Sequence, residues 1–317
     1  NSMSLIEGAE TIVNQCLKIE EDEHVVVLND SNDEEMIESL LDVLSDNNIN
    51  HELVEYEEPE KQGQEPPLPA AEKMKNSDVF IAPTNKSLSW TDARVQATEN
   101  GARGATLPGI TKEIWTGALQ ADYERVSEIT DKAHELLKDV EKVTIQSPSG
   151  TDLEVGLGDK LVPGKGIVTE SGNFSNLPAG EVFTAPISAE GVMVIDDFVV
   201  PGRGTKLRIE DGEVKEILSQ DTSDEIKEAV HDIENGENIA EFGFGTNPQA
   251  EIIGHVLQDE KSLGTVHIAI GNSMPIAEKE GNGRQSEIHW DNVIEEPTVK
   301  FDGRKVLDEG EPVFLDE

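Results

Sequence analysis

The pattern of apolar residues changes part-way along this chain, and that change sets what the chain can fold into. Before residue 142, segments of helical period alternate with short apolar strands, as in HVVVL followed by EEMIESLLDVLSD. Such alternation is typical of a doubly wound, mostly parallel sheet. After a long amphipathic helix at about 122–139, short β-rich segments separated by Gly, Pro, Asn and Asp predominate. We therefore predict an α/β protein with an N-terminal, doubly wound α/β domain (1–141) and a C-terminal, mainly antiparallel α+β domain (142–317).

The charge balance limits the partners of this protein. It has 66 acidic and 25 basic residues, a formal net charge of -41. Such a surface repels phosphate, so we expect neither nucleic acid nor a membrane as a partner. The acids are dispersed among regular apolar positions, which argues against disorder. High salt would screen their repulsion, so we predict a halophilic, archaeal protein.

Three further absences in the sequence narrow the class of protein. The single cysteine excludes an intramolecular disulfide, and no apolar run is long enough to span a membrane. We therefore expect a cytoplasmic protein. No glycine-rich GxGxxG or P-loop pattern opens a predicted helix, so a nucleotide cofactor is not implied.

Four strand-like segments in the second half carry carboxylates or imidazoles that suit a divalent metal. They are Glu181 in NLPAGEVFTAP, Glu241 in IAEFGFGTN, His267 in GTVHIAIGN, and His289 with Asp291 in SEIHWDN. Alternate side chains on a strand share a face, so the His and Asp of the last segment can bind one ion. Neutral imidazole nitrogens and anionic oxygens are the ligands of zinc, manganese and iron sites. These segments together predict a metal site.

Each candidate ligand also has a purely structural interpretation. A lone histidine such as His267 is more often a hydrogen-bonded core residue, although a Thr and an Ala on its strand face leave room for an ion. Glu241 shares its face with Gly243 and Gly245, which again leaves space beside the carboxylate. Glu181 alone is as consistent with a surface or capping acid. The metal interpretation is favoured because all of these segments occur in one chain.

The segments NLPAGEVFTAP, EFGFGTNP, GTVHIAIGN and HWD resemble, in that order, the signature blocks of the aminopeptidase T and aminopeptidase S family of metallopeptidases. RGATLPGIT, QADYERVSEIT and SPSGTDLEVGL are also similar, so the likeness covers most of the chain after about residue 78. The resemblance implies a two-domain protein, usually a homodimer, with two ions of zinc, manganese or cobalt in the C-terminal domain. It also implies the ligands Glu181, Glu241, His267, His289 and Asp291, the two glutamates being catalytic as well.

One departure from the family opens an alternative. The peptidases carry a Tyr seven residues after the His of the third block, where this chain has Met274. The Gly-Asn after HIAI and the PAGE form of the first block resemble a sister branch that includes 2,5-dihydroxypyridine dioxygenase, which uses one Fe(II). That similarity implies a facial triad of His267, His289 and Asp291. We expect Met274 and Arg284 to contact the substrate in either case, although a solvated loop is the simpler place for the arginine.

Aromatic side chains near the site bear on this alternative, because an aromatic substrate would pack on them. Phe183 and Trp290 are available, whereas strand alternation turns Phe242 and Phe244 away from the metal.

The charge of the ligand shell favours hydrolysis. Three carboxylates bring about -3, which two divalent ions convert to about +1, a suitable environment for a metal-bound hydroxide. One ion leaves the same shell at about -1. Because the resemblance also includes the glutamates of both peptidase blocks, Glu181 and Glu241, we predict a metal-dependent aminopeptidase-type hydrolase that removes N-terminal residues from a peptide or acts on a small molecule. The alternatives are a ring-cleaving Fe(II) dioxygenase of dihydroxypyridine-like aromatics and a metal-binding protein that has lost catalysis.

Overall fold

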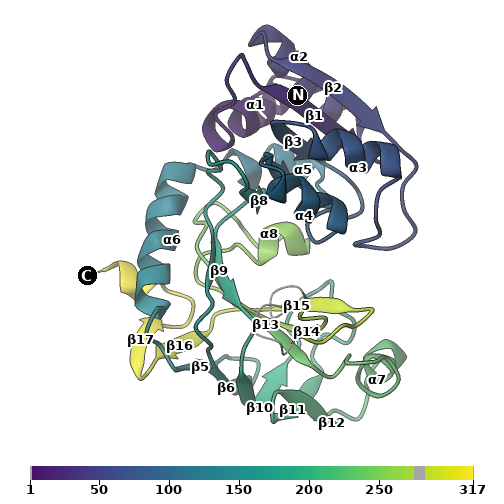
Figure 1. Cartoon of the computed structure of the whole chain (residues 1–317). Coiled ribbons are helices and arrows are strands. Elements are labelled where there is room, and N and C mark those ends of the chain that lie inside the picture. Colours follow the sequence, from purple (N-terminus) through teal and green to yellow (C-terminus); the bar gives the residue numbers. More distant parts are fainter. Residues whose placement is uncertain (1, 275–282, 317) are drawn as a thin grey trace. The chain divides into compact units, whose positions relative to one another are not determined.

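Three β-sheets organise the protein, which a computed structural model describes over residues 2–274 and 283–316 (Figure 1). They are distributed between two units of the chain. Unit 1 comprises Asn1–Ser127 with Gly164–Ala179, and unit 2 comprises Glu128–Pro163 with Gly180–Glu317.

Unit 1 is built on a parallel sheet, sheet A, with strand order β2-β1-β3-β4-β8. Its strands are β1 (His24–Asn29), β2 (Asn50–Glu55), β3 (Val79–Ala82), β4 (Arg103–Thr106) and β8 (Phe174–Asn176). Its helices are α1 (Ser2–Glu10), a π-helical turn at Thr11–Cys16, α2 (Glu34–Asp46), α3 (Leu68–Lys75), α4 (Asp92–Glu99), α5 (Lys112–Trp115) and a 3-10 turn at Ala118–Gln120. The parallel N-terminal sheet confirms the prediction from the alternating pattern.

Helix α2 shows how the local sequence fixes an element of this unit. The carboxylate of Asp33 accepts hydrogen bonds from the backbone N–H groups of Glu35 and Met36, and so caps the first turn. Met36, Leu40 and Leu44 recur at helical spacing and are buried. The helix therefore begins directly after its N-cap residue Asp33 and packs through one apolar face.

Unit 2 contains two antiparallel sheets. Sheet B has the order β12-β11-β10-β6-β5-β16-β17, and sheet C has the order β15-β14-β13-β9-β7. The strands are β5 (Lys142–Gln146), β6 (Asp152–Gly156), β7 (Val162–Gly164), β9 (Glu181–Thr184), β10 (Ser188–Val194), β11 (Lys206–Glu210), β12 (Glu213–Ile217), β13 (Ile239–Gly245), β14 (Val266–Gly271), β15 (His289–Ile294), β16 (Thr298–Phe301) and β17 (Arg304–Leu307). The helical segments are α6 (Tyr123–Leu137), which begins in unit 1, α7 (Asp224–His231), α8 (Val256–Asp259) and a 3-10 turn at Val313–Leu315. This content confirms the predicted antiparallel second half.

One apolar core joins the two sheets of unit 2. It combines side chains of sheet B with Phe242 and Phe244 of sheet C and with Ile129 and Leu137 of helix α6. Both phenylalanines are fully buried, and the ring of Phe244 lies 5.4 Å from that of Phe301. The face of β13 that carries them is therefore filled, and only its opposite face is left for polar chemistry.

The chain crosses between the units more than once. After β7 it leaves unit 2, adds β8 beside β4 at the edge of sheet A, and returns at Gly180. The predicted boundary between residues 141 and 142 falls within unit 2, because the second half of α6 packs in that unit's core. A strand as short as β8 carries no periodic signal in the sequence.

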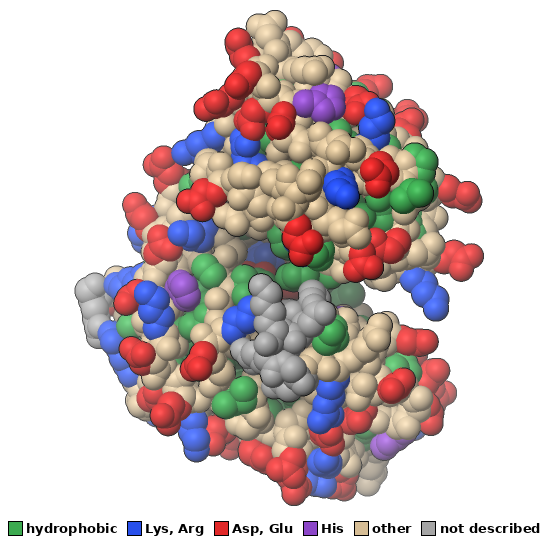
Figure 2. Space-filling view, viewed as in Figure 1, with side chains coloured by type: hydrophobic (Ala, Val, Ile, Leu, Met, Phe, Trp, Pro, Cys, Tyr) green, Lys and Arg blue, Asp and Glu red, His purple; other side chains and the backbone are tan. Residues whose placement is uncertain are grey.

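Many of the acidic side chains lie on the surface, although a few are buried, among them Glu181 and Glu241. Figure 2 shows Asp and Glu side chains spread over the visible face, with fewer Lys and Arg side chains among them. Among the described residues, no helix combines the length and apolar character that a membrane crossing requires.

Candidate metal centre

The register of sheet C brings the predicted ligands to one face. Directly paired residues of antiparallel strands point to the same side of the sheet. The pairs are Glu181 with Gly245, His267 with Gly243, Glu241 with Ala269, Asp291 with Ala269, and His289 with Gly271. All five predicted ligands therefore share the face opposite the phenylalanine core.

The ligand atoms of these side chains also lie close together. The Nε2 atom of His267 is 3.6 Å from Oε2 of Glu181 and 3.4 Å from Oε2 of Glu241. The Nε2 atom of His289 is 3.8 Å from the same Glu241 oxygen and 3.3 Å from Oδ1 of Asp291. Glu241 thus lies between the two imidazoles.

Small residues make room for this cluster, as the sequence pattern indicated. A Cβ atom placed on Gly243 would lie 2.0 Å from both Cε1 and Nε2 of His267. No side chain larger than hydrogen fits there without moving the imidazole.

Hydrogen bonding prepares His289 to act as a ligand. Its Nδ1 atom lies 2.7 Å from the carbonyl oxygen of Asn272. A carbonyl only accepts hydrogen bonds, so Nδ1 carries a proton and donates it, and in the neutral imidazole Nε2 has the lone pair. Burial lowers the pKa of His289, but Asp291 and Glu241 outweigh it and raise that pKa well above its usual value, so without metal Nε2 also holds a proton, which an entering ion would displace.

Among the described residues, the buried Nδ1 atom of His267 has no hydrogen-bond partner, and the buried Oδ1 atom of Asp291 has none beyond its 3.3 Å ion pair with Nε2 of His289. Buried polar atoms with so few partners are uncommon, and both of these belong to groups that bind metals well. The residues present therefore fit a divalent ion.

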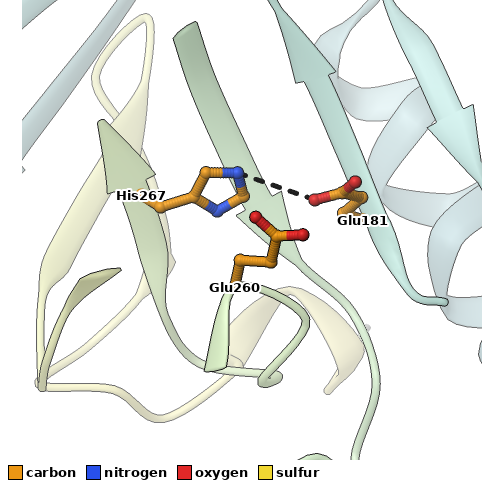
Figure 3. Close-up of side chains that lie close together, drawn as sticks. All are labelled: Glu181, Glu260 and His267. Atoms are coloured by element: carbon orange, nitrogen blue, oxygen red, sulfur yellow. Dashed lines mark ion pairs between the residues drawn. The ribbon is translucent and has the colours of Figure 1, made fainter. Parts of the chain in front are cut away.

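A sixth side chain, Glu260, joins the cluster and was missed in the sequence. Two groups have ligand atoms within 4.8 Å of one another: Glu181, Glu260 and His267, and Glu241, His267 and Asp291. Figure 3 shows the first group, in which both carboxylates point toward the imidazole. Glu260 directly follows the short helix α8 and lies in no strand, so strand alternation could not reveal it. The sequence offers one signal for it: in the segment DEKSLG, shortly before β14, Glu260 stands directly before a basic residue, Lys261.

The two strand glutamates differ in acidity when no metal is bound. Burial raises the pKa of Glu181 to about 8, although the charge of Lys261 opposes this shift. Burial acts in the same direction on Glu241, but its interactions with His267 and His289 outweigh it and lower the pKa to about 2. Burial lowers the pKa of His267, yet the neighbouring carboxylates outweigh it and raise that pKa to about 10. The metal-free cluster therefore holds protons that an entering ion would displace.

The two residues predicted to contact substrate make hydrogen bonds to neighbouring side chains. Arg284 donates from Nη1 to Oε1 of Glu213 at 2.6 Å, and its backbone N–H donates to Oγ of Ser273 at 2.8 Å. The guanidinium is thus paired with an acid of β12. The backbone N–H of Met274 donates to Oδ1 of Asn272 at 3.3 Å, in the turn that also orients His289.

The fold and the cluster together define a class of protein: a two-unit α/β protein with a cluster of carboxylates and imidazoles suited to divalent metals. The family model of the thermophilic metalloproteases (M29) matches residues 115–316. The chain belongs to this family of metallopeptidases. This confirms the resemblance drawn from the sequence, and the family implies a divalent metal.

Solved structures agree with this assignment at the level of the fold. The structure of 2,5-dihydroxypyridine dioxygenase from Pseudomonas putida KT2440 has a TM-score of 0.80 and 20% identity, covering 99% of this chain and 98% of that one. Wild-type AmpT from Thermus thermophilus has a TM-score of 0.71 and 17% identity, covering 98% of this chain and 99% of that one. No curated protein sequence matches the chain. At these identities the likeness concerns the fold alone.

Proposed function

We propose that the protein is an aminopeptidase-type metallohydrolase that removes N-terminal residues from peptides. The observation that carries the proposal is the meeting of two candidate ligand groups at His267. Two groups with four different carboxylates suit two neighbouring divalent ions better than one. Membership of a metallopeptidase family supports the same reaction class.

The ligands would be Glu181, Glu241, His267, His289 and Asp291, together with Glu260. Bound divalent ions, whether zinc, manganese or cobalt, would polarise the scissile carbonyl and lower the pKa of a water.

The two strand glutamates have different roles in this proposal. Glu241 contacts both imidazoles, so its carboxylate is committed to holding the centre together. The ion pair described for Glu181 is with His267 alone. Its carboxylate is therefore the freer of the two to accept a proton from the attacking water.

Selectivity for a free amino terminus would come from the bound ions. A neutral α-amino nitrogen has a lone pair to offer a divalent ion, whereas the lone pair of an acetylated nitrogen is delocalised into the amide. Unblocked peptides should therefore be substrates, and N-acetylated peptides of the same sequence should not.

A second candidate function is a mononuclear Fe(II) dioxygenase of dihydroxypyridine-like aromatics. Three features favour it: the fold shared with the dioxygenase structure, Met274 at the peptidase Tyr position, and Phe183, which is paired with Gly243 and lies on the face of the cluster. Its ligands would be His267, His289 and Asp291. A third candidate, a metal-binding protein without catalysis, rests on Met274 alone.

Metal counting combined with two assays separates these candidates. Protein purified in molar salt is stripped of metal, reloaded with zinc, manganese, cobalt or, without oxygen, Fe(II), and subjected to elemental analysis. We expect about two ions per chain and release of amino acids from unblocked peptides only. One iron per chain with oxygen uptake on dihydroxypyridines would establish the second candidate, and bound metal with neither activity the third.

Variants of β15 test the ligand assignment. His289→Ala and Asp291→Ala should each lose at least one ion per chain. Glu287→Gln is the matched control, because Glu287 is an exposed acid two residues before the histidine and belongs to neither ligand group. Unchanged metal content in both alanine variants would refute the assignment.

We also propose a cytoplasmic homodimer from a halophilic archaeon, on the family resemblance and the charge balance. Sedimentation velocity in molar salt should give twice the chain mass of 34.6 kDa. A monomer under those conditions would refute the dimer.

A further inference from the structure

Lys261 is a buried cation beside the cluster of candidate metal ligands, and its side chain is only 1% exposed. Burying an ammonium group costs several kcal/mol unless close partners compensate it. Its Nζ atom donates to Oε1 of Glu260 and, at 3.1 Å, to the carbonyl oxygen of Leu257 in α8. The lysine thus ties the carboxylate of Glu260 to the end of that short helix.

Glu260 has one carboxylate oxygen on the ammonium and a second oxygen to offer. It is one of the three residues whose ligand atoms gather around His267, with Glu181 as the third (Figure 3). Carboxylates that bind metals are usually held by hydrogen bonds, which fix the orientation of the free oxygen. The pair Glu260–Lys261 has this arrangement.

The ammonium also balances the charge of the cluster. The two ligand groups contain four carboxylates, one more than the sequence indicated. The buried Lys261 cancels the added charge of Glu260, so two divalent ions still leave a shell near +1, about the value that favours a metal-bound hydroxide.

We propose that Lys261 is a positioning residue that holds Glu260 as a ligand for the ion at the group of Glu181, Glu260 and His267. This inference rests on the proposed metal-binding function. The competing explanation is structural: Lys261 stabilises the end of α8 through Leu257, and its contact with Glu260 has no effect on metal binding.

The test is a calorimetric titration of zinc alone into the metal-free protein in molar salt. Lys261→Met keeps the length of the side chain and removes its charge. One binding step should weaken by about 10–100-fold, while the step assigned to Glu241, His267 and Asp291 stays within about threefold. A lysine of purely structural importance would lower the melting temperature and leave both affinities unchanged.

A double-mutant cycle shows whether the lysine acts through the glutamate. In Glu260→Gln the ligand is already lost, so adding Lys261→Met should lower zinc affinity by no more than about threefold. The double variant also removes both buried charges and is the easier one to fold. If Lys261→Met does not fold, Lys261→Gln replaces it, because the glutamine amide can still donate a hydrogen bond to Glu260. Lys261→Gln should weaken the zinc-binding step at Glu181, Glu260 and His267 less than Glu260→Gln does.

The outcomes separate this inference from the proposed function. Zinc affinity in Lys261→Met equal to that of the wild type overturns the inference and leaves the metal site standing. Losses that multiply in the double variant overturn it as well. A wild-type protein that binds no zinc, manganese, cobalt or iron overturns the proposed function and the inference together.

Discussion

Replacement of Gly243 by alanine is the sharpest available test of the centre, because the change is one methyl group. Gly243 lies on β13 opposite His267, with its missing side chain directed at the imidazole. The added Cβ would lie 2.0 Å from Cε1 and Nε2 of that ring. The methyl group therefore meets the atom proposed to bind metal.

The size of the effect follows from that distance. Ordinary contact begins at 3.4 Å, so the ring must move by about 1.4 Å to relieve a contact of 2.0 Å. Displacing a reactive or ligating group by about 1 Å costs on the order of 100-fold, which is about 2.7 kcal/mol. Overpacking should also lower the stability of the metal-free protein by about 1–3 kcal/mol.

The assay is zinc titration by calorimetry, with the melting temperature measured in parallel. Gly212→Ala is the control: it lies in the β11–β12 hairpin at φ 73°, and no atom of the described residues lies within 4 Å of its added methyl group. It should cost stability through backbone strain alone and leave zinc affinity unchanged. Zinc affinity within about threefold of the wild type in folded Gly243→Ala would show that His267 is no ligand.

Three further predictions concern the whole fold. Hydrogen bonds from Arg103 hold the pKa of Glu23 below its usual value, so the pair stabilises the fold above the unfolded pKa, and this contribution is lost as pH falls through the folded pKa. Glu23→Gln should therefore lose about 2 kcal/mol near pH 7, and the difference from wild type should shrink below about pH 4.5. Urea unfolding over a pH series checks this, and a constant difference contradicts it. The melting temperature should rise steeply between about 0.1 M and 1 M salt, because the Debye length falls from about 10 to 3 Å; scanning calorimetry that shows no salt dependence would refute the halophile prediction. Phe244→Ala should cost about 3–5 kcal/mol in urea unfolding, because the fully buried ring packs against Phe301 and a cavity would remain; a loss below about 1 kcal/mol would mean that the core collapses around it.

The sequence predicted the sheet types because hydrophobic periodicity is local. HVVVL and the helical segment after it predicted a parallel sheet, and the β-rich second half predicted antiparallel sheets. Alternation also predicted that Phe242 and Phe244 face the core. The return of the chain to sheet A through β8 depends on pairing between Gly104 and Phe174, which are far apart in sequence and carry no local mark.

The grouping of the candidate ligands was predictable where strands carry them. Alternation and the family resemblance brought out Glu181, Glu241, His267, His289 and Asp291, and sheet C places all of them on one face. Glu260 and Lys261 lie beyond a short helix, where no period relates a residue to its neighbours. The pairing of Arg284 with Glu213 is equally invisible in sequence, because it depends on how separate segments meet.

Residues 164–179 belong to unit 1 although they lie between two parts of unit 2 in the sequence, and this affects how the protein can be divided into fragments. No single cut separates the two units, because unit 1 takes its edge strand from a segment that lies between two parts of unit 2. A fragment that ends at residue 141 would lack β8 and leave the edge of β4 unpaired, which favours association with other chains. The complementary fragment would carry β8 without its sheet. Fragment expression would therefore require a cut between residues 127 and 128, with 164–179 grafted onto the first piece and a short linker bridging the gap in the second.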